Sequence, residues 1–202
     1  MSKTRSWRLM VALVCGIAAL SACNSLDPPT SGPQSPGPKA RVASAPPNTS
    51  LPMPPLNGGS LNNLGWTADG GQRNVFSDFR GKVLILDFYA TWCQPCRRSI
   101  PHLIELQKKF ADQGLQVIGL NVGGPDDLKE VPAFVQEFGI QYPLAVPDDE
   151  LISFLLHDND AIPQTFVFDR QGQLAVRLIG FGPDAPARID SAVAAAMRTP
   201  AP

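Results

Sequence analysis

A nearly continuous apolar run, Val-Leu-Ile-Leu-Asp-Phe-Tyr, occupies residues 83–89, and Asp87 is its one charged position. A run of this length is typical of a strand that is covered on both faces. Residues 115–122 form a second apolar run and predict a second buried strand. Since such strands need helices on both sides of their sheet, the pattern favours an α/β domain.

Apolar residues recur at helical spacing after the first run, at Leu103, Leu106 and Phe110, and Gly114 marks the end of that predicted helix. Residues 169–172, Asp-Arg-Gln-Gly, are typical of a hairpin turn. The remaining predicted elements are helices over 130–138, 148–156 and 188–197 and strands over 141–146, 165–168 and 173–179. Together they predict a mixed central β-sheet flanked by helices over residues 61–198, with 199–202 as a disordered tail.

The N-terminal 22 residues predict a signal peptide, because a basic start is followed by the short apolar run 9–20. Small residues then precede Cys23, which resembles the lipobox of bacterial lipoproteins. The resemblance implies cleavage before Cys23 and lipidation of its side chain. An ordinary secretory signal cut near Ala22 is the alternative.

Residues 23–60 predict a disordered tether. The stretch contains ten prolines between Pro28 and Pro55, mixed with Ser, Gly and Asn, and it offers few large apolar side chains to bury. As a flexible coil it would reach on the order of 35 Å. A passive spacer and a tether of tuned length fit this composition equally well.

Composition excludes some classes of protein. The 202 residues carry a net charge of −1, which gives no basic surface for nucleic acid. Four cysteines are too few for a disulfide-stapled scaffold. We expect a monomer without a bound cofactor.

Two cysteines separated by two residues, Cys93 and Cys96, follow the first predicted strand and open the next predicted helix. The helix N-terminus favours a thiolate, which lowers the pKa of Cys93 and makes it the nucleophile. Cys96, one turn inside, suits the resolving role. A zinc site is the competing interpretation, but only His102 and His157 could complete it.

The stretch 88–97 with Pro101, followed by the stretch 161–169, resembles the thioredoxin superfamily, in particular its membrane-anchored TlpA/ResA-like branch. The resemblance implies a thioredoxin-like fold with a helix–strand insertion over residues 123–156. It also implies a cis bond between Ile162 and Pro163 in a loop that faces the cysteines and binds substrate.

The same resemblance assigns roles to further residues. Asp87 corresponds to a buried carboxylate that exchanges a proton with the resolving cysteine, although an exposed strand-end Asp is the alternative. Trp92 corresponds to a flat wall beside the nucleophile, or to simple packing. Ser99 stands where the TlpA-like branch usually has Glu, which points to Asp87 or to water for proton handling.

These residues predict a thiol–disulfide oxidoreductase of the bacterial cell envelope, lipid-anchored to a membrane and facing the periplasm or the extracytoplasmic space. We expect it to reduce disulfides of exported proteins, cytochrome c maturation included, with electrons from a membrane donor. A thiol peroxidase is an alternative, although a Pro-x-x-x-Thr-x-x-Cys pattern is missing. A copper-binding module is another, but it would need a Cys-x-x-x-Cys spacing. The Gln94–Pro95 dipeptide adds no charge and favours a moderately reducing potential.

Overall fold

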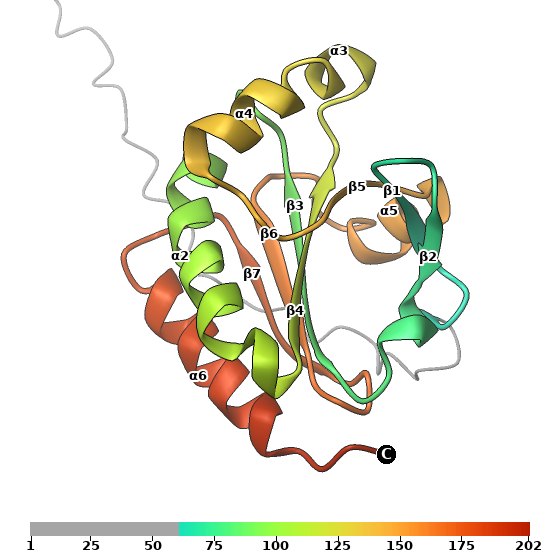
Figure 1. Ribbon diagram of the computed structural model, residues 1–202, viewed down its shortest axis with the longest axis vertical. Coiled ribbons are helices and arrows are strands. Elements are labelled where there is room, and N and C mark those ends of the chain that lie inside the picture. Colours follow the sequence, from blue (N-terminus) through green and yellow to red (C-terminus); the bar gives the residue numbers. More distant parts are fainter. Residues whose placement is uncertain (1–60) are drawn as a thin grey trace, which may run out of the picture. The chain divides into compact units, whose positions relative to one another are not determined.

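The computed structural model describes residues 61–202, and Figure 1 shows their arrangement. The predicted signal peptide over 1–22, lipidation at Cys23 and the tether over 23–60 therefore lie outside the described residues. Within residues 61–202, the helices are too short or too polar to cross a membrane.

One seven-stranded sheet runs through the described domain in the order β2-β1-β5-β4-β3-β6-β7. Its strands are β1 (Gly65–Ala68), β2 (Arg73–Val75), β3 (Val83–Tyr89), β4 (Leu115–Asn121), β5 (Leu144–Pro147), β6 (Gln164–Phe168) and β7 (Leu174–Ile179). β3 pairs in parallel with β4 and antiparallel with β6, and every residue of β3 is buried. The sheet is therefore mixed, and its central strand is the one that leads to the cysteines.

Helices cover both faces of this sheet (Figure 1). They are α2 (Gln94–Phe110), α3 (Pro125–Leu128), α4 (Val131–Phe138), α5 (Asp149–Leu155) and α6 (Ala185–Arg198), with 3-10 turns η1 (Phe76–Phe79) and η2 (Ala111–Gln113). Side chains of α2, α4 and α6 pack with Ile85 and Tyr89 on one face, whereas α5 and η1 pack with Leu86 and Phe88 on the other. The alternation along β3 thus divides the core into two clusters.

The predicted strand over 83–89 matches β3 residue for residue, and the other predicted elements end within a few residues of the observed ones. The hairpin β1–β2 and the short helix α3 were not predicted. The face of α4 is centred on Phe134, which stacks on Tyr89 with ring centroids 5.6 Å apart. Val131, Val135 and Phe138 lie on either side of it and are half-buried.

The insertion between β4 and β6 is present and is larger than a helix and a strand. It holds α3, α4, β5 and α5, and β5 joins the sheet beside β4 in parallel. Gly139 ends α4 with a φ of 64°, a left-handed conformation that glycine adopts without strain. The insertion therefore extends the sheet and places α3 and α4 beyond the carboxyl end of β4.

Phe166 offers a test of the second cluster. Its side chain is fully buried, and its ring lies edge-on to Phe88 with centroids 5.7 Å apart. We expect Phe166→Ala to lower the free energy of unfolding by about 3–5 kcal/mol, because it leaves a cavity beside β3. Chemical denaturation measures this, with Val146→Ala, 41% exposed, as the control that should change it by about 0.5 kcal/mol. Equal losses in the two variants would contradict the described core.

Candidate active site

Cys93 and Cys96 lie where the central strand gives way to α2, and their sulfurs form a disulfide with the two Cα atoms 5.2 Å apart. Cys93 is the N-cap of α2, in an extended conformation, and Cys96 lies in its first turn. The chain reaches this point from β3 through a short turn in which the Cys93 N–H donates to the Ala90 carbonyl at 3.2 Å. The predicted strand–turn–helix placement of the pair is therefore observed.

The N-terminus of α2 places a backbone N–H donor and the positive end of the helix dipole beside the Cys93 sulfur. The Cys96 N–H donates to Cys93 Sγ at 3.2 Å, as an N-cap oxygen would accept it. When the disulfide is reduced, this donor and the helix dipole favour the thiolate of Cys93. Cys93 keeps 4% exposure whereas Cys96 is fully buried, so an incoming disulfide reaches Cys93 first.

Ser99 has a structural task. Its buried hydroxyl donates to the Cys96 carbonyl at 2.8 Å, within α2 itself. The position therefore supplies no carboxylate to the sulfurs, as its sequence identity already indicated.

Asp87 is 1% exposed, so the alternative of an exposed strand-end residue is wrong. Its neighbours Ile85 and Tyr89 belong to the same cluster as both cysteines, and alternation along the strand points Asp87 to that face as well. Burial raises the pKa of this carboxyl from 3.8 to about 7, opposed by the hydrogen bond that Thr165 Oγ1 donates to Asp87 Oδ1 at 2.7 Å. Near neutrality the group can therefore both release and take up a proton.

The tyrosines on this face keep their protons. Burial raises the pKa of Tyr89 to about 12 and that of Tyr142 well above its usual value, and the charge of Asp87 adds to both shifts. Because neither phenol ionises near pH 7, Asp87 is the group of this trio that titrates there.

The bond between Ile162 and Pro163 is cis, as predicted. Gln164 holds this loop in place. Its fully buried side-chain amide donates to the Asn159 carbonyl at 2.6 Å. Arg177 of β7 donates to Gln164 Oε1 from Nε at 2.9 Å and from Nη2 at 2.7 Å. Its Nη1 also lies 2.8 Å from Asp158 Oδ1, which fixes the start of the same loop. Gln164 and Arg177 thus hold the loop, and sequence reasoning singled out neither.

Trp92 precedes the nucleophile and is 66% exposed. This exposure contradicts simple core packing and leaves the indole free to contact another molecule. Single exposed aromatic side chains beside a reactive group supply contact area at low entropic cost.

Sequence reasoning also missed Thr165. The antiparallel register places Thr165 directly opposite Asp87, across the β3–β6 pair. The signal was present in part, because Thr165 belongs to the stretch that carried the resemblance, but the pairing register was needed to connect it with Asp87.

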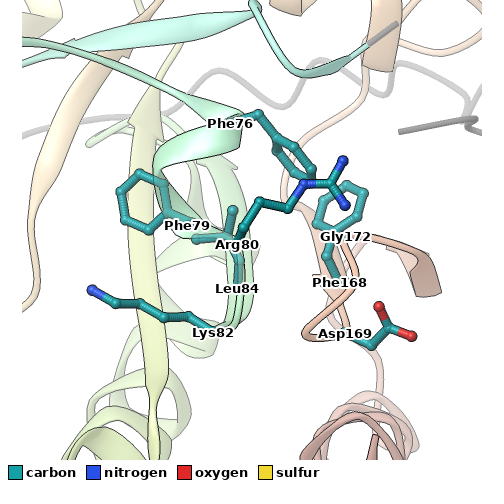
Figure 2. Close-up of a pocket in the computed structure, with 8 residues that line it drawn as sticks. All are labelled: Phe76, Phe79, Arg80, Lys82, Leu84, Phe168, Asp169 and Gly172. Atoms are coloured by element: carbon teal, nitrogen blue, oxygen red, sulfur yellow. The ribbon is translucent and has the colours of Figure 1, made fainter. Parts of the chain in front are cut away.

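A shallow hollow lies at the other end of the central strand (Figure 2). It is lined by Phe76, Phe79, Arg80, Lys82, Leu84, Phe168, Asp169 and Gly172. Lys82 precedes β3, whereas the cysteines follow it, so the hollow and the disulfide are at opposite ends of the sheet. The Arg80 guanidinium donates to Asn62 Oδ1 at 2.7 Å and to the Gln171 carbonyl, which ties this end together.

A metal site has little support within residues 61–202. No group of three or more His, Cys, Asp or Glu side chains in that range is arranged to hold an ion. His102 lies 3.1 Å from Asp190 of α6, and His157 Nδ1 lies 3.1 Å from the Phe154 carbonyl. Both imidazoles have neighbours of their own, and the two sulfurs are bonded to each other.

Comparison with known families agrees with the fold. The family model described as AhpC/TSA family matches residues 50–177, more than half of the chain. The chain belongs to the AhpC/TSA family. This AhpC/TSA domain has a thioredoxin-like fold, with the mixed sheet and flanking helices predicted from the sequence.

Two curated relatives show which members of the family it resembles. The thiol-disulfide oxidoreductase ResA of Geobacillus kaustophilus is 32% identical over 111 residues, which cover 54% of this chain and 62% of that protein. ResA of Bacillus subtilis is 29% identical over 110 residues, covering 54% and 60%. The chain thus matches less than two thirds of the length of these relatives.

Solved structures give the same likeness. A putative thiol:disulfide interchange protein DsbE from Chlorobium tepidum aligns with a TM-score of 0.59 and 26% identity, over 68% of this chain and 94% of that chain. A thioredoxin-family thiol:disulfide interchange protein from Chlorobium tepidum TLS aligns with a TM-score of 0.56 and 28% identity, over 73% and 99%. The likeness to the TlpA/ResA-like branch of the thioredoxin superfamily is therefore shown in sequence and in structure.

The burial of Asp87 makes stability depend on pH. Its pKa of about 7 lies above the ordinary 3.8, so its contribution is fully present below about pH 4 and is lost as pH rises through 7. We expect wild type to lose up to about 1.4 kcal/mol per pH unit relative to Asp87→Asn over this window. Urea denaturation at several pH values measures the difference.

Val146→Ala, an exposed change without a titratable group, serves as the control, and its difference from wild type should stay flat with pH. A flat difference for Asp87→Asn as well would show that the buried carboxyl does not titrate in this range.

Proposed function

We propose that this protein is a thiol–disulfide oxidoreductase that reduces disulfides of exported proteins through Cys93 and Cys96. The observation that carries the proposal is the placement of Cys93 as the N-cap of α2, bonded to a fully buried Cys96. The ResA and DsbE likenesses support it. Asp87 serves as the proton acceptor for Cys96, and the Ile162–Pro163 loop with Trp92 contacts the substrate.

The reaction begins with the reduced pair. The Cys93 thiolate attacks one sulfur of the substrate disulfide, a mixed disulfide forms, and the other substrate sulfur leaves as a thiolate that takes a proton. Cys96 then gives its proton to the Asp87 carboxylate and attacks Cys93 Sγ. The second substrate thiolate leaves, and the Cys93–Cys96 disulfide remains. Two electrons have passed to the substrate, so a thiol donor must reduce the pair again.

The surroundings of the pair favour the reducing direction. Gln94 and Pro95, between the cysteines, carry no charge that would stabilise the reduced form strongly. A moderately reducing potential, nearer thioredoxin's about −270 mV than about −120 mV, follows.

The finer assignment concerns place and partners. A lipid on Cys23, outside the described residues, would hold a monomer to a membrane, facing the periplasm or the extracytoplasmic space. A membrane donor would supply the electrons. The ResA likeness makes cytochrome c maturation the first pathway to test, since thiols must be reduced there.

The sulfur pair can be tested with insulin as the disulfide substrate and dithiothreitol as the electron source. We expect Cys93→Ser to lower turnover at least about 100-fold, because Cys96, the sulfur that remains among the described residues, is fully buried. When pre-reduced Cys96→Ser is mixed with insulin without dithiothreitol, it should instead accumulate a mixed disulfide that mass spectrometry detects. Undiminished turnover in Cys93→Ser would sink the proposal, and rapid consumption of hydrogen peroxide by wild type would favour a thiol peroxidase.

The hydrogen bond from Thr165 provides a test of proton transfer. Thr165→Val removes a contact that lowers the pKa of Asp87, so this pKa should rise above about 7 and the rise of turnover with pH should move to higher pH. Thr165→Ser keeps the hydroxyl and should restore the wild-type profile. Asp87→Asn should remove that limb of the profile. Profiles that coincide in all four proteins would exclude Asp87 from the reaction.

A further inference from the structure

Thr91, two residues before Cys93, is held on both sides of its backbone. Its N–H donates to Asp127, at 3.2 Å to Oδ1 and 3.1 Å to Oδ2, and its hydroxyl donates to the same carboxylate. Its carbonyl accepts from Arg97 Nη1 at 3.2 Å. Asp127 belongs to α3 and Arg97 to α2, so two separate elements fix one residue of the turn.

The carboxylate of Asp127 is itself firmly seated. The residue is 6% exposed, and its Oδ2 accepts from Asn121 Nδ2 at 2.6 Å. Asn121 ends β4 beside Tyr89, and its Oδ1 accepts from the Gly123 N–H at 3.0 Å. A Cβ on Gly123 would lie 2.4 Å from Asp127 Cγ, so the carboxylate packs directly against this glycine.

Arg97 is anchored to the same insertion. Its guanidinium pairs with Glu137 of α4 and lies over the rings of Phe134 and Phe138, 5.4 and 4.9 Å from their centroids. The charge of Arg97 is therefore paired with α4. Its Nη1 donates to the Thr91 carbonyl. Both contacts on Thr91 depend on residues of the segment between β4 and β5.

These contacts bear on the position of Cys93. In the oxidised protein the Cys93–Cys96 disulfide itself holds the turn to α2. After reduction that bond is absent, and the turn is held only by hydrogen bonds and packing. The Thr91 contacts then oppose movement of Cys93 away from the helix N–H groups that favour its thiolate.

We propose that Asp127 is a positioning residue for Cys93: through Thr91, and together with Arg97, it keeps the nucleophile at the N-terminus of α2 when the disulfide is reduced. The inserted segment thereby sets the reactivity of the sulfur pair, in addition to extending the sheet. This rests on the proposed function, because the readout that matters is attack by Cys93 on a disulfide.

The test changes the two neighbours of Asp127 in the full chain. Replacing Asp127 itself would also remove a negative charge close to Cys93, which alone would lower the pKa of the thiol. Thr91→Val removes the hydroxyl donor, and Gly123→Ala displaces the carboxylate, and both keep the charge. Thr91→Ser keeps the hydroxyl as the rescue, and Thr67→Val on β1 is the matched control.

Two quantities are measured on the reduced protein: the pKa of Cys93 from thiolate absorbance, and the rate of attack on a small aromatic disulfide. We expect Thr91→Val and Gly123→Ala to raise that pKa and to slow attack about tenfold at pH 7. Thr91→Ser and Thr67→Val should match wild type. Loss of packing alone would lower stability without moving the pKa.

Wild-type pKa and rate in both Thr91→Val and Gly123→Ala would overturn the proposal. If one of them does not fold, the other decides the question, because each disturbs the same carboxylate from a different side. Failure of the wild type to reduce insulin would count against the proposed function only, since the pKa of Cys93 is measured without substrate.

Discussion

The redox site depends on one junction, where the buried strand β3 ends and α2 begins. The strand is fixed by its neighbours on both sides, and the helix is fixed by Ile100 and Leu103 packed on the sheet. The turn between them places Cys93 at the N-cap of α2. Because a helix N-terminus carries unpaired N–H groups and a positive dipole end, the fold itself supplies the potential that a thiolate needs.

A second requirement is proton transfer at a sulfur with no access to water. Cys96 is fully buried, so the proton that it loses must go to a group inside the protein. Asp87 is on the correct face, and burial brings the pKa of its carboxyl to about 7. The Ser99 position, which is a carboxylate in the TlpA-like branch, here only closes a helix hydrogen bond. In the reaction proposed above, the proton acceptor for Cys96 is therefore on the strand rather than on the helix.

The sequence alone predicted the parts of this site that are local. The apolar run 83–89 and the cysteine spacing were recognisable, because each is written in consecutive residues. The cis Ile162–Pro163 bond was expected only from the resemblance to the thioredoxin superfamily. The hairpin β1–β2 was missed because its strands are short and its apolar pattern is weak.

Contacts between distant residues could not be predicted in this way. Thr165 meets Asp87 only through the register of β3 and β6, and Asp127 meets Thr91 across 36 positions of the chain. Arg97 of α2 lies over two aromatic rings that belong to α4. Pairing and packing decide these contacts, and neither leaves a periodic signal.

The buried carboxyl of Asp87 on β3 makes the stability of the fold depend on pH. A single proton on Asp87 strengthens the fold and, in the proposed reaction, also removes the base for Cys96. At acidic pH the protein would be more stable against unfolding but less reactive in the proposed exchange. At neutral pH the deprotonated carboxylate could again accept the proton of Cys96, but the free energy of unfolding would be lower. The protonation state of Asp87 would thus link the stability of the protein to its reactivity.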